Sequence, residues 1–309
     1  MNALPETSET RTEFAHANWW PVITGAAWLA FSALTLGVPM LDGGIAVAAR
    51  VASVVLGMVL LLTILMAAER PKWSLSTRIC MAAVGIGVVL LAYFLNLKGS
   101  ELKPLIALAL MALAVPVGYW IGERMEKITN LIPLAIAMSL ADIFSVFQGP
   151  TKVIADNLTT HYKKVATLTN QGTPAAMQEL DTMRAPLADY IIVHFPIAGM
   201  QTSLPILGIG DFVVLAFLFR AAWVHHVSPR LMLCAAAGSI FAALLVSNAL
   251  SMPLPALPFI AIGTIAVLFL TQPRLRRLDR QEVVLSLVVV ALFGALITGK
   301  YLNALMKMQ

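Results

Sequence analysis

Charged residues are scarce in this chain, since only 12% of its 309 residues are Asp, Glu, Lys or Arg, whereas 59% are hydrophobic. So little polar surface cannot coat a soluble globule of this length. The apolar runs are about 20 residues long and lack the period-two alternation of barrel strands, so helices are expected to cross the bilayer. The composition therefore predicts an all-α polytopic membrane protein.

Several chemical signatures are also missing. The two cysteines, Cys80 and Cys234, fall inside apolar runs without metal-ligand spacing, so each is expected to act as a small buried hydrophobe. The chain has no His-Glu-x-x-His sequence, and His225-His226 stands at the edge of an apolar run without acidic partners. We therefore expect no metal and no organic cofactor.

The charges that are present indicate a membrane environment. The net charge of +5 is modest, and Lys and Arg lie mostly at the edges of apolar runs, which favours contact with anionic lipid headgroups rather than nucleic acid. The first eighteen residues lack a basic segment ahead of the first apolar run, so no cleaved signal peptide is expected. The distribution of Lys and Arg predicts a cytoplasmic N-terminus. The expected location is the cell (plasma) membrane.

A window of about 20 residues predicts nine transmembrane helices. They cover residues 19–40, 44–67, 76–97, 103–122, 128–148, 204–223, 230–250, 253–271 and 282–303. Residues 1–18 form a polar tail, and the polar stretch 149–203 interrupts the apolar runs. We therefore predict an N-terminal helical subdomain over 19–148, a hinge or loop region over 149–203, and a C-terminal helical subdomain over 204–309.

Two parts of the hinge region have apolar character. Lys152–Leu168 mixes apolar and basic residues, which suits either a helix along the membrane interface or a solvated loop. Ile191–Ile197 is β-branched and aromatic and is too short to span. It is either a re-entrant or interfacial segment, or an edge strand that pairs with an extended substrate.

Two of the sixteen acidic residues, Asp142 and Asp211, lie deep inside apolar runs, whereas every other carboxylate sits in a tail, a loop or a run edge. An ionisable group in a membrane span is expensive to bury, so each is a candidate functional residue. Asp142 lies about six residues before the long connection and Asp211 about seven after it, which puts both roughly 10 Å below one membrane face. Pro255-Ala256-Leu257 heads a run that starts from the same face.

A pair of carboxylates at one depth can hydrolyse a peptide bond. Two like groups a few ångström apart cannot both ionise, so the pair shares one proton near neutral pH. The ionised group then takes a proton from water, while the protonated group polarises the scissile carbonyl. Gly208 and Gly210 leave room beside Asp211 for a neighbouring helix or a substrate backbone. Pro255 and Pro258 lack backbone donors, so that stretch should be partly unwound or should start a helix.

This combination resembles the presenilin and signal peptide peptidase families of intramembrane aspartyl proteases. The resemblance covers roughly residues 140–270, in the order Asp helix, Gly-x-Gly-Asp helix, intervening helix and Pro-Ala-Leu helix, and residues 142–152 also look like microbial presenilin-like proteins. It departs from the family where Ala141 replaces the usual Tyr, where the first acid falls on the fifth predicted helix instead of the sixth, and where a span follows the Pro-Ala-Leu helix.

The resemblance implies a presenilin-like bundle and an enzyme that cleaves transmembrane peptides or proteins, including signal-peptide-like helices. It implies that Asp142 and Asp211 are catalytic. The residues that it assigns to substrate binding and to the shape of the active site are Gly208, Gly210, Pro255, Ala256 and Leu257. Transmembrane substrates and membrane lipids are the expected partners.

Two other functions suit the same acids. A proton-coupled transporter uses intramembrane carboxylates to bind or relay a cation, and a catalytically silent scaffold would bind membrane helices without cleaving them. An Asp can also be the structural partner of an Arg, but Arg220 lies nine residues after Asp211, about half a turn out of phase, so a pair within one helix is not expected.

Overall fold

The computed structural model describes residues 20–38, 43–69, 73–97, 99–171, 173–199, 203–250 and 254–272, with single residues and short stretches between 280 and 295. The described chain is mostly helical and divides by its internal contacts into two compact units. Unit 1 comprises Met1–Glu123 and Ile192–Val224, and unit 2 comprises Arg124–Ile191 and His225–Gln309. The chain therefore passes twice through each unit.

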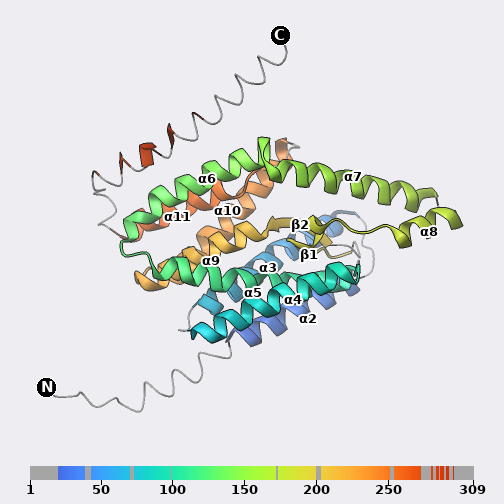
Figure 1. Ribbon diagram of the computed structural model, residues 1–309, viewed down its shortest axis with the longest axis horizontal. Coiled ribbons are helices and arrows are strands. Elements are labelled where there is room, and N and C mark those ends of the chain that lie inside the picture. The colour runs from blue at the N-terminus through green and yellow to red at the C-terminus, as the bar shows by residue number, and fades with distance from the viewer. Residues whose placement is uncertain are drawn as a thin grey trace, which may run out of the picture. The chain divides into compact units, whose positions relative to one another are not determined.

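Unit 1 is built around one central helix. Its helices are α2 (Trp20–Gly37), α3 (Gly43–Glu69), α4 (Leu75–Phe94), α5 (Lys103–Glu123) and α9 (Ile209–Val224). Helix α5 packs against α4 and α9 (Figure 1). The approach of α9 is close because α5 presents glycines to it: a Cβ atom on Gly118 would lie 2.6 Å from the backbone nitrogen of Phe217. Small residues permit such backbone contacts between membrane helices.

A β-hairpin belongs to the same unit. Strands β1 (Ile192–Pro196) and β2 (Ser203–Gly208) pair antiparallel, with an irregularity in register between Val193 and His194. Val193 and Phe195 are fully buried, and the Phe195 ring meets the Trp28 ring of α2 edge-on, with 6.0 Å between centroids. The hairpin is anchored further where Ala198 donates its N–H to Ser53 Oγ of α3, at 3.2 Å. The segment is therefore a strand, and its pairing with an extended substrate stays a prediction.

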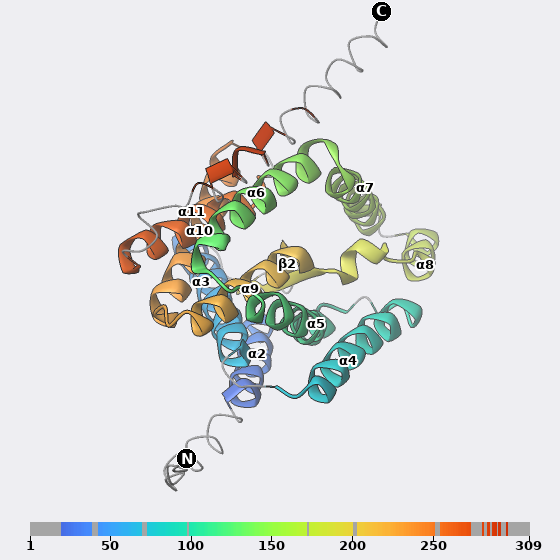
Figure 2. The same ribbon diagram turned by 60° about the vertical axis from the view of Figure 1, so that its left-hand side comes forward.

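Unit 2 contains α6 (Leu131–Gln148), α7 (Pro150–Gln171), α8 (Pro174–Thr182), α10 (Pro229–Leu250) and α11 (Leu257–Thr271). Helix α6 packs against α11, and α11 packs against α10 (Figure 2). Helix α7 begins directly after Gly149, where Pro150 suits a first helical position. The segment Lys152–Leu168 is thus helical rather than a loop. Helix α8 folds against α7, with Lys164 and Glu179 forming an ion pair at 2.8 Å.

Among the described residues, six helices are long and apolar enough to cross a membrane, which indicates a multi-pass helical membrane protein. They are Trp20–Gly37, Gly44–Glu69, Leu75–Phe94, Ser100–Glu123, Ile128–Phe147 and Pro229–Leu250. They match the first five and the seventh of the nine predicted spans. The ninth predicted span, 282–303, falls largely outside the described residues.

Two predicted spans begin later than expected. The span predicted at 204–223 opens with strand β2, and its helix α9 has 16 residues, because Pro205 interrupts helical hydrogen bonding and the segment pairs with β1 instead. The span predicted at 253–271 becomes the 15-residue helix α11, which starts only after Pro255. Both shortened helices carry motifs of the candidate site.

Candidate functional site

Asp211 lies in the first turn of α9, immediately after the hairpin. Its Oδ2 atom accepts a hydrogen bond from the backbone N–H of Gly208 at 3.0 Å. Gly208 directly precedes the helix and Asp211 is the helix's third residue, so this is the reciprocal contact of a capping box, in which a side chain near the helix start binds the preceding N–H. The contact holds the carboxylate in a defined orientation at the positive end of the helix.

The two glycines of this motif leave space beside Asp211. An added Cβ on Gly208 would meet Asp211 Oδ2 at 3.8 Å, and one on Gly210 would meet no described atom within 4 Å. The described residues therefore place no helix against these glycines, and the room expected for a neighbouring helix or a substrate backbone stays a prediction. The open space beside Gly210, which is exposed, adjoins Asp211.

Asp142 lies on α6, and its carboxylate reaches the Pro-Ala-Leu segment of the same unit. Asp142 Oδ2 accepts a hydrogen bond from the backbone N–H of Leu257 at 3.1 Å. Leu257 is the first residue of α11, and Ala256 before it has no side-chain oxygen to cap the helix. Asp142 therefore supplies the acceptor from a neighbouring helix, where the helix dipole favours negative charge.

The Pro-Ala-Leu segment starts a helix, as the sequence predicts. Pro255 is buried and extends the chain into the turn, and Ala256 occupies the position before the helix. Pro258 at the second helical position has no N–H, so few backbone donors remain at this helix end. The N–H of Leu257 is one of them, and Asp142 accepts its hydrogen bond. The structure thus brings together Asp142 and Leu257, which are 115 residues apart in the sequence.

The two acids belong to different units. Asp211 with Gly208 and Gly210 lies in unit 1, and Asp142 with Pro255, Ala256 and Leu257 lies in unit 2. In each unit a backbone N–H at a helix start donates a hydrogen bond to one oxygen of the carboxylate.

Burial of the acids differs from the sequence prediction. Asp142 and Asp211 are only partly buried, whereas Glu69 is 0% exposed and Asp189 is 6% exposed. Glu69 ends its helix, so its position at a run edge gave no sign of burial.

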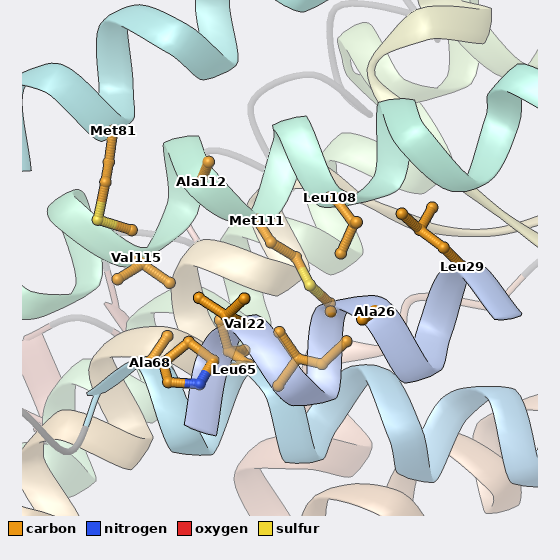
Figure 3. Close-up of a pocket in the computed structure, with 13 residues that line it drawn as sticks. Val22, Ala26, Leu29, Leu65, Ala68, Met81, Leu108, Met111, Ala112 and Val115 are labelled. Atoms are coloured by element: carbon orange, nitrogen blue, oxygen red, sulfur yellow. The ribbon is translucent and has the colours of Figure 1, made fainter. Parts of the chain in front are cut away.

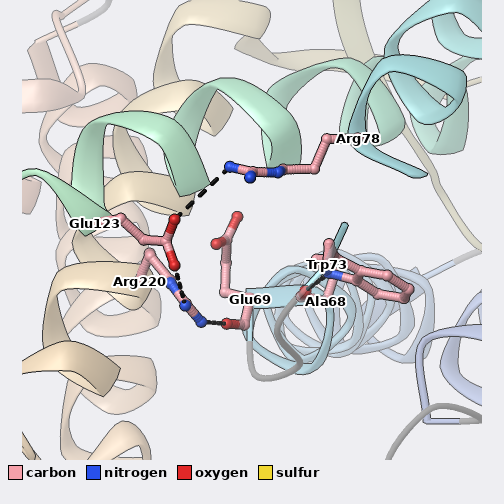
Figure 4. A network of polar contacts seen from close by, with 6 residues as sticks. All are labelled: Ala68, Glu69, Trp73, Arg78, Glu123 and Arg220. Carbon is pink, nitrogen blue, oxygen red and sulfur yellow. Dashed lines mark hydrogen bonds and ion pairs between the residues drawn. The ribbon is translucent and has the colours of Figure 1, made fainter. Parts of the chain in front are cut away.

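A second polar cluster lies at the opposite end of α9 from Asp211. Arg220 donates from Nη1 to the backbone carbonyl of Glu69 at 2.8 Å and from Nη2 to Glu123 Oε1 at 2.8 Å (Figure 4). Its guanidinium also stacks on the ring of Tyr119, 3.8 Å from the centroid, and Arg78 pairs with Glu123 at 3.7 Å. These contacts join α3, α4, α5 and α9.

The sequence pattern does not reveal this cluster. The nine-residue spacing argues against Asp211 as the partner of Arg220, and in the structure Arg220 has other partners. Those partners come from α3 and α5, so no spacing within one helix could reveal them. The available signal was an arginine inside an apolar run together with acids at the ends of two other runs.

Neither cysteine is a buried hydrophobe, because Cys80 and Cys234 are both exposed on their helices. Among the described residues, no group of three or more His, Cys, Asp or Glu side chains is placed to hold a metal ion.

Comparison of the chain with protein families, with characterised proteins and with solved structures found no match.

Proposed function

We propose that this chain is an intramembrane aspartyl endopeptidase that cleaves transmembrane or signal-peptide-like helices. The observation that carries the proposal is the hydrogen bond between Leu257 N–H and Asp142 Oδ2, which links the first acid to the Pro-Ala-Leu segment. A further support is that Asp211 is oriented by Gly208 within its own motif. The enzyme would act in the cell membrane with its N-terminus in the cytoplasm.

The chemistry uses the two carboxylates as one acid and one base. The ionised carboxylate takes a proton from water, and the water oxygen bonds to the scissile carbonyl carbon while the protonated carboxyl gives its proton to the carbonyl oxygen. The tetrahedral intermediate then loses a proton from one hydroxyl, the C–N bond breaks, and the amine nitrogen is protonated by a carboxyl group. One water is consumed, and the pair again shares one proton.

A substrate helix must unwind before its carbonyl can be reached. The hairpin offers a place for the unwound segment, because each of its two strands keeps one edge that no other described strand pairs with. Strand β2 leads directly through Gly208 into the turn that holds Asp211. A peptide strand beside the hairpin would therefore lie close to this acid.

The test replaces each acid by its isosteric amide. Asp142→Asn and Asp211→Asn each keep an oxygen that accepts the backbone N–H, so the fold should survive while proton transfer fails. We expect cleavage of a reconstituted transmembrane peptide, followed by mass spectrometry, to fall at least about a thousandfold in each variant.

The matched control is Asp156→Asn, which removes an exposed carboxylate of α7 and should cleave like the parent chain. Full cleavage by either Asp142→Asn or Asp211→Asn would refute the proposal.

Proton-coupled transport is the second candidate, and the buried Glu69 favours it. Both carboxylate oxygens of Glu69 lack a hydrogen-bond partner among the described residues. Buried carboxylates in membrane spans serve as proton relays in transporters. Solute uptake into proteoliposomes driven by a pH gradient, lost in Glu69→Gln and without any peptide product, would establish transport instead of proteolysis. A peptide that binds but stays intact would indicate a scaffold.

A further inference from the structure

Unit 1 contains an apolar groove formed by four of its helices. Its volume is about 410 Å³, and every residue that lines it is apolar. Side chains from α2, α3, α4 and α5 converge on it, and Met81 of α4 points toward Val115 of α5 (Figure 3). The lining residues are Pro21, Val22, Gly25, Ala26, Leu29, Ile64, Leu65, Ala68, Met81, Leu108, Met111, Ala112 and Val115.

The groove lies at membrane depth and is continuous with the lipid-facing surface. All four helices belong to candidate spans. Val22 and Leu29, on its wall, are 59% and 40% exposed, so the groove opens onto the apolar surface of α2. In a bilayer that surface meets hydrocarbon.

One end of the groove has the features of a membrane interface. Ala68 stands there, and its carbonyl accepts a hydrogen bond from Trp73 Nε1 at 2.6 Å. Trp20 at the start of α2 is 52% exposed. Tryptophan gathers at the headgroup level of membranes.

The size and chemistry of the groove exclude several occupants. Water needs polar partners, and the lining offers no polar side chain. The segment before Trp20 carries Glu6, Glu9 and Glu13, which are unsuited to an apolar groove. A second helix is about 10 Å wide and far larger than this volume. With roughly 30 Å³ for a group the size of water or a methylene, the groove accommodates on the order of a dozen methylenes, as in an acyl chain.

We propose that this groove binds one acyl chain of a membrane phospholipid, with the headgroup at the end marked by Trp20 and Trp73. The lipid fills the space between α2 and α4 over the floor made by α3 and α5. This site is separate from Asp142 and Asp211 in its residues and does not depend on proteolysis.

The test replaces a glycine that lines the groove by leucine, so that the new side chain fills the groove. The control is the same substitution at a glycine outside the groove. An added Cβ on Gly25, in the groove, or on Gly87, outside it on α4, meets no described atom within 4 Å. The chain and its Gly25→Leu and Gly87→Leu variants are purified in micelles with phosphatidylglycerol and examined by native mass spectrometry. We expect one lipid to remain on the parent chain and on Gly87→Leu, and at least tenfold less on Gly25→Leu.

Equal lipid retention by Gly25→Leu and the parent would overturn the proposal. If Gly25→Leu does not fold, Ala112→Leu replaces it in the test, because its side chain fills the same groove from α5. As an independent measurement, phosphatidylglycerol with a diazirine in its acyl chain should label peptides that contain Met81 or Met111. Labelling elsewhere, or labelling of this groove by a transmembrane peptide in place of the lipid, would also overturn it.

Discussion

Arg220 shows how a single charged residue can be held inside a helical bundle. Its side chain is 6% exposed, yet two nitrogens donate at 2.8 Å and its planar face covers Tyr119. A buried guanidinium requires such partners, because its hydration is lost. The arginine therefore fixes the end of α9 to α3 and α5.

Replacing Arg220 should weaken the fold of unit 1. We expect Arg220→Met to lower the free energy of unfolding by about 2–3 kcal/mol, since it removes two charge-assisted hydrogen bonds and leaves a buried carbonyl unsatisfied. Denaturation in mixed micelles measures the change. Arg230→Met, which alters an exposed arginine at the start of α10, is the control and should change stability by less than about 0.5 kcal/mol. Equal effects of the two substitutions would contradict this account.

At the scale of elements, α5 and α9 pack closely in the unit that holds Asp211. It depends on glycines of α5, since a Cβ on Gly118 would meet the Cβ and backbone of Ala216 and the backbone nitrogen of Phe217. Backbone atoms cannot move aside without shifting the whole helix. Because Asp211 stands at the start of α9, the packing of this helix also sets where its carboxylate lies.

Adding one methyl group should therefore separate these helices. We expect Gly118→Ala to destabilise the chain by about 2 kcal/mol through overpacking. The control is Gly87→Ala on α4, where a Cβ meets no described atom and the substitution should stabilise by up to about 1 kcal/mol through helix propensity. Thermal unfolding of the two variants in the same detergent compares them. A neutral Gly118→Ala would mean that α9 does not pack as described.

At the scale of the whole molecule, the proposed chemistry depends on how two units meet. Each unit presents one carboxylate whose Oδ2 is held by a backbone N–H at a helix start. The chain crosses between the units at residues 123–124, 191–192 and 224–225.

Cross-linking tests whether the two acids face each other. In a background with Cys80→Ala and Cys234→Ala, the double variant Asp142→Cys and Asp211→Cys should form an intrachain link with a short bis-thiol reagent or, with Cα atoms within about 7 Å, a disulfide. Gel mobility and mass spectrometry of linked peptides detect it. Each single variant is the control and should give no intrachain product. If the double variant forms no intrachain link with any short reagent, the two acids cannot share one catalytic site.

Much of the candidate site was accessible from sequence because its signals are local. An acid inside an apolar run, a Gly-x-Gly before another acid, and a proline pair at a helix start each depend on neighbouring residues. The strand at Ile192–Pro196 was also foreseeable, since β-branched residues followed by proline suit a short extended segment. The capping contact of Asp211 with Gly208 follows from a three-residue spacing and could have been predicted in the same way.

The sequence by itself determined that the chain is a helical membrane protein, because the hydropathy of long runs is a property of the runs alone. Tertiary structure decided the contacts that join distant segments: Asp142 with Leu257, Arg220 with Glu123, and Phe195 with Trp28. It also decided that Glu69 is enclosed while Asp142 and Asp211 are partly exposed. The physical reason is that burial and pairing depend on which helix faces pack together, and the periodicity of one helix does not specify its neighbour.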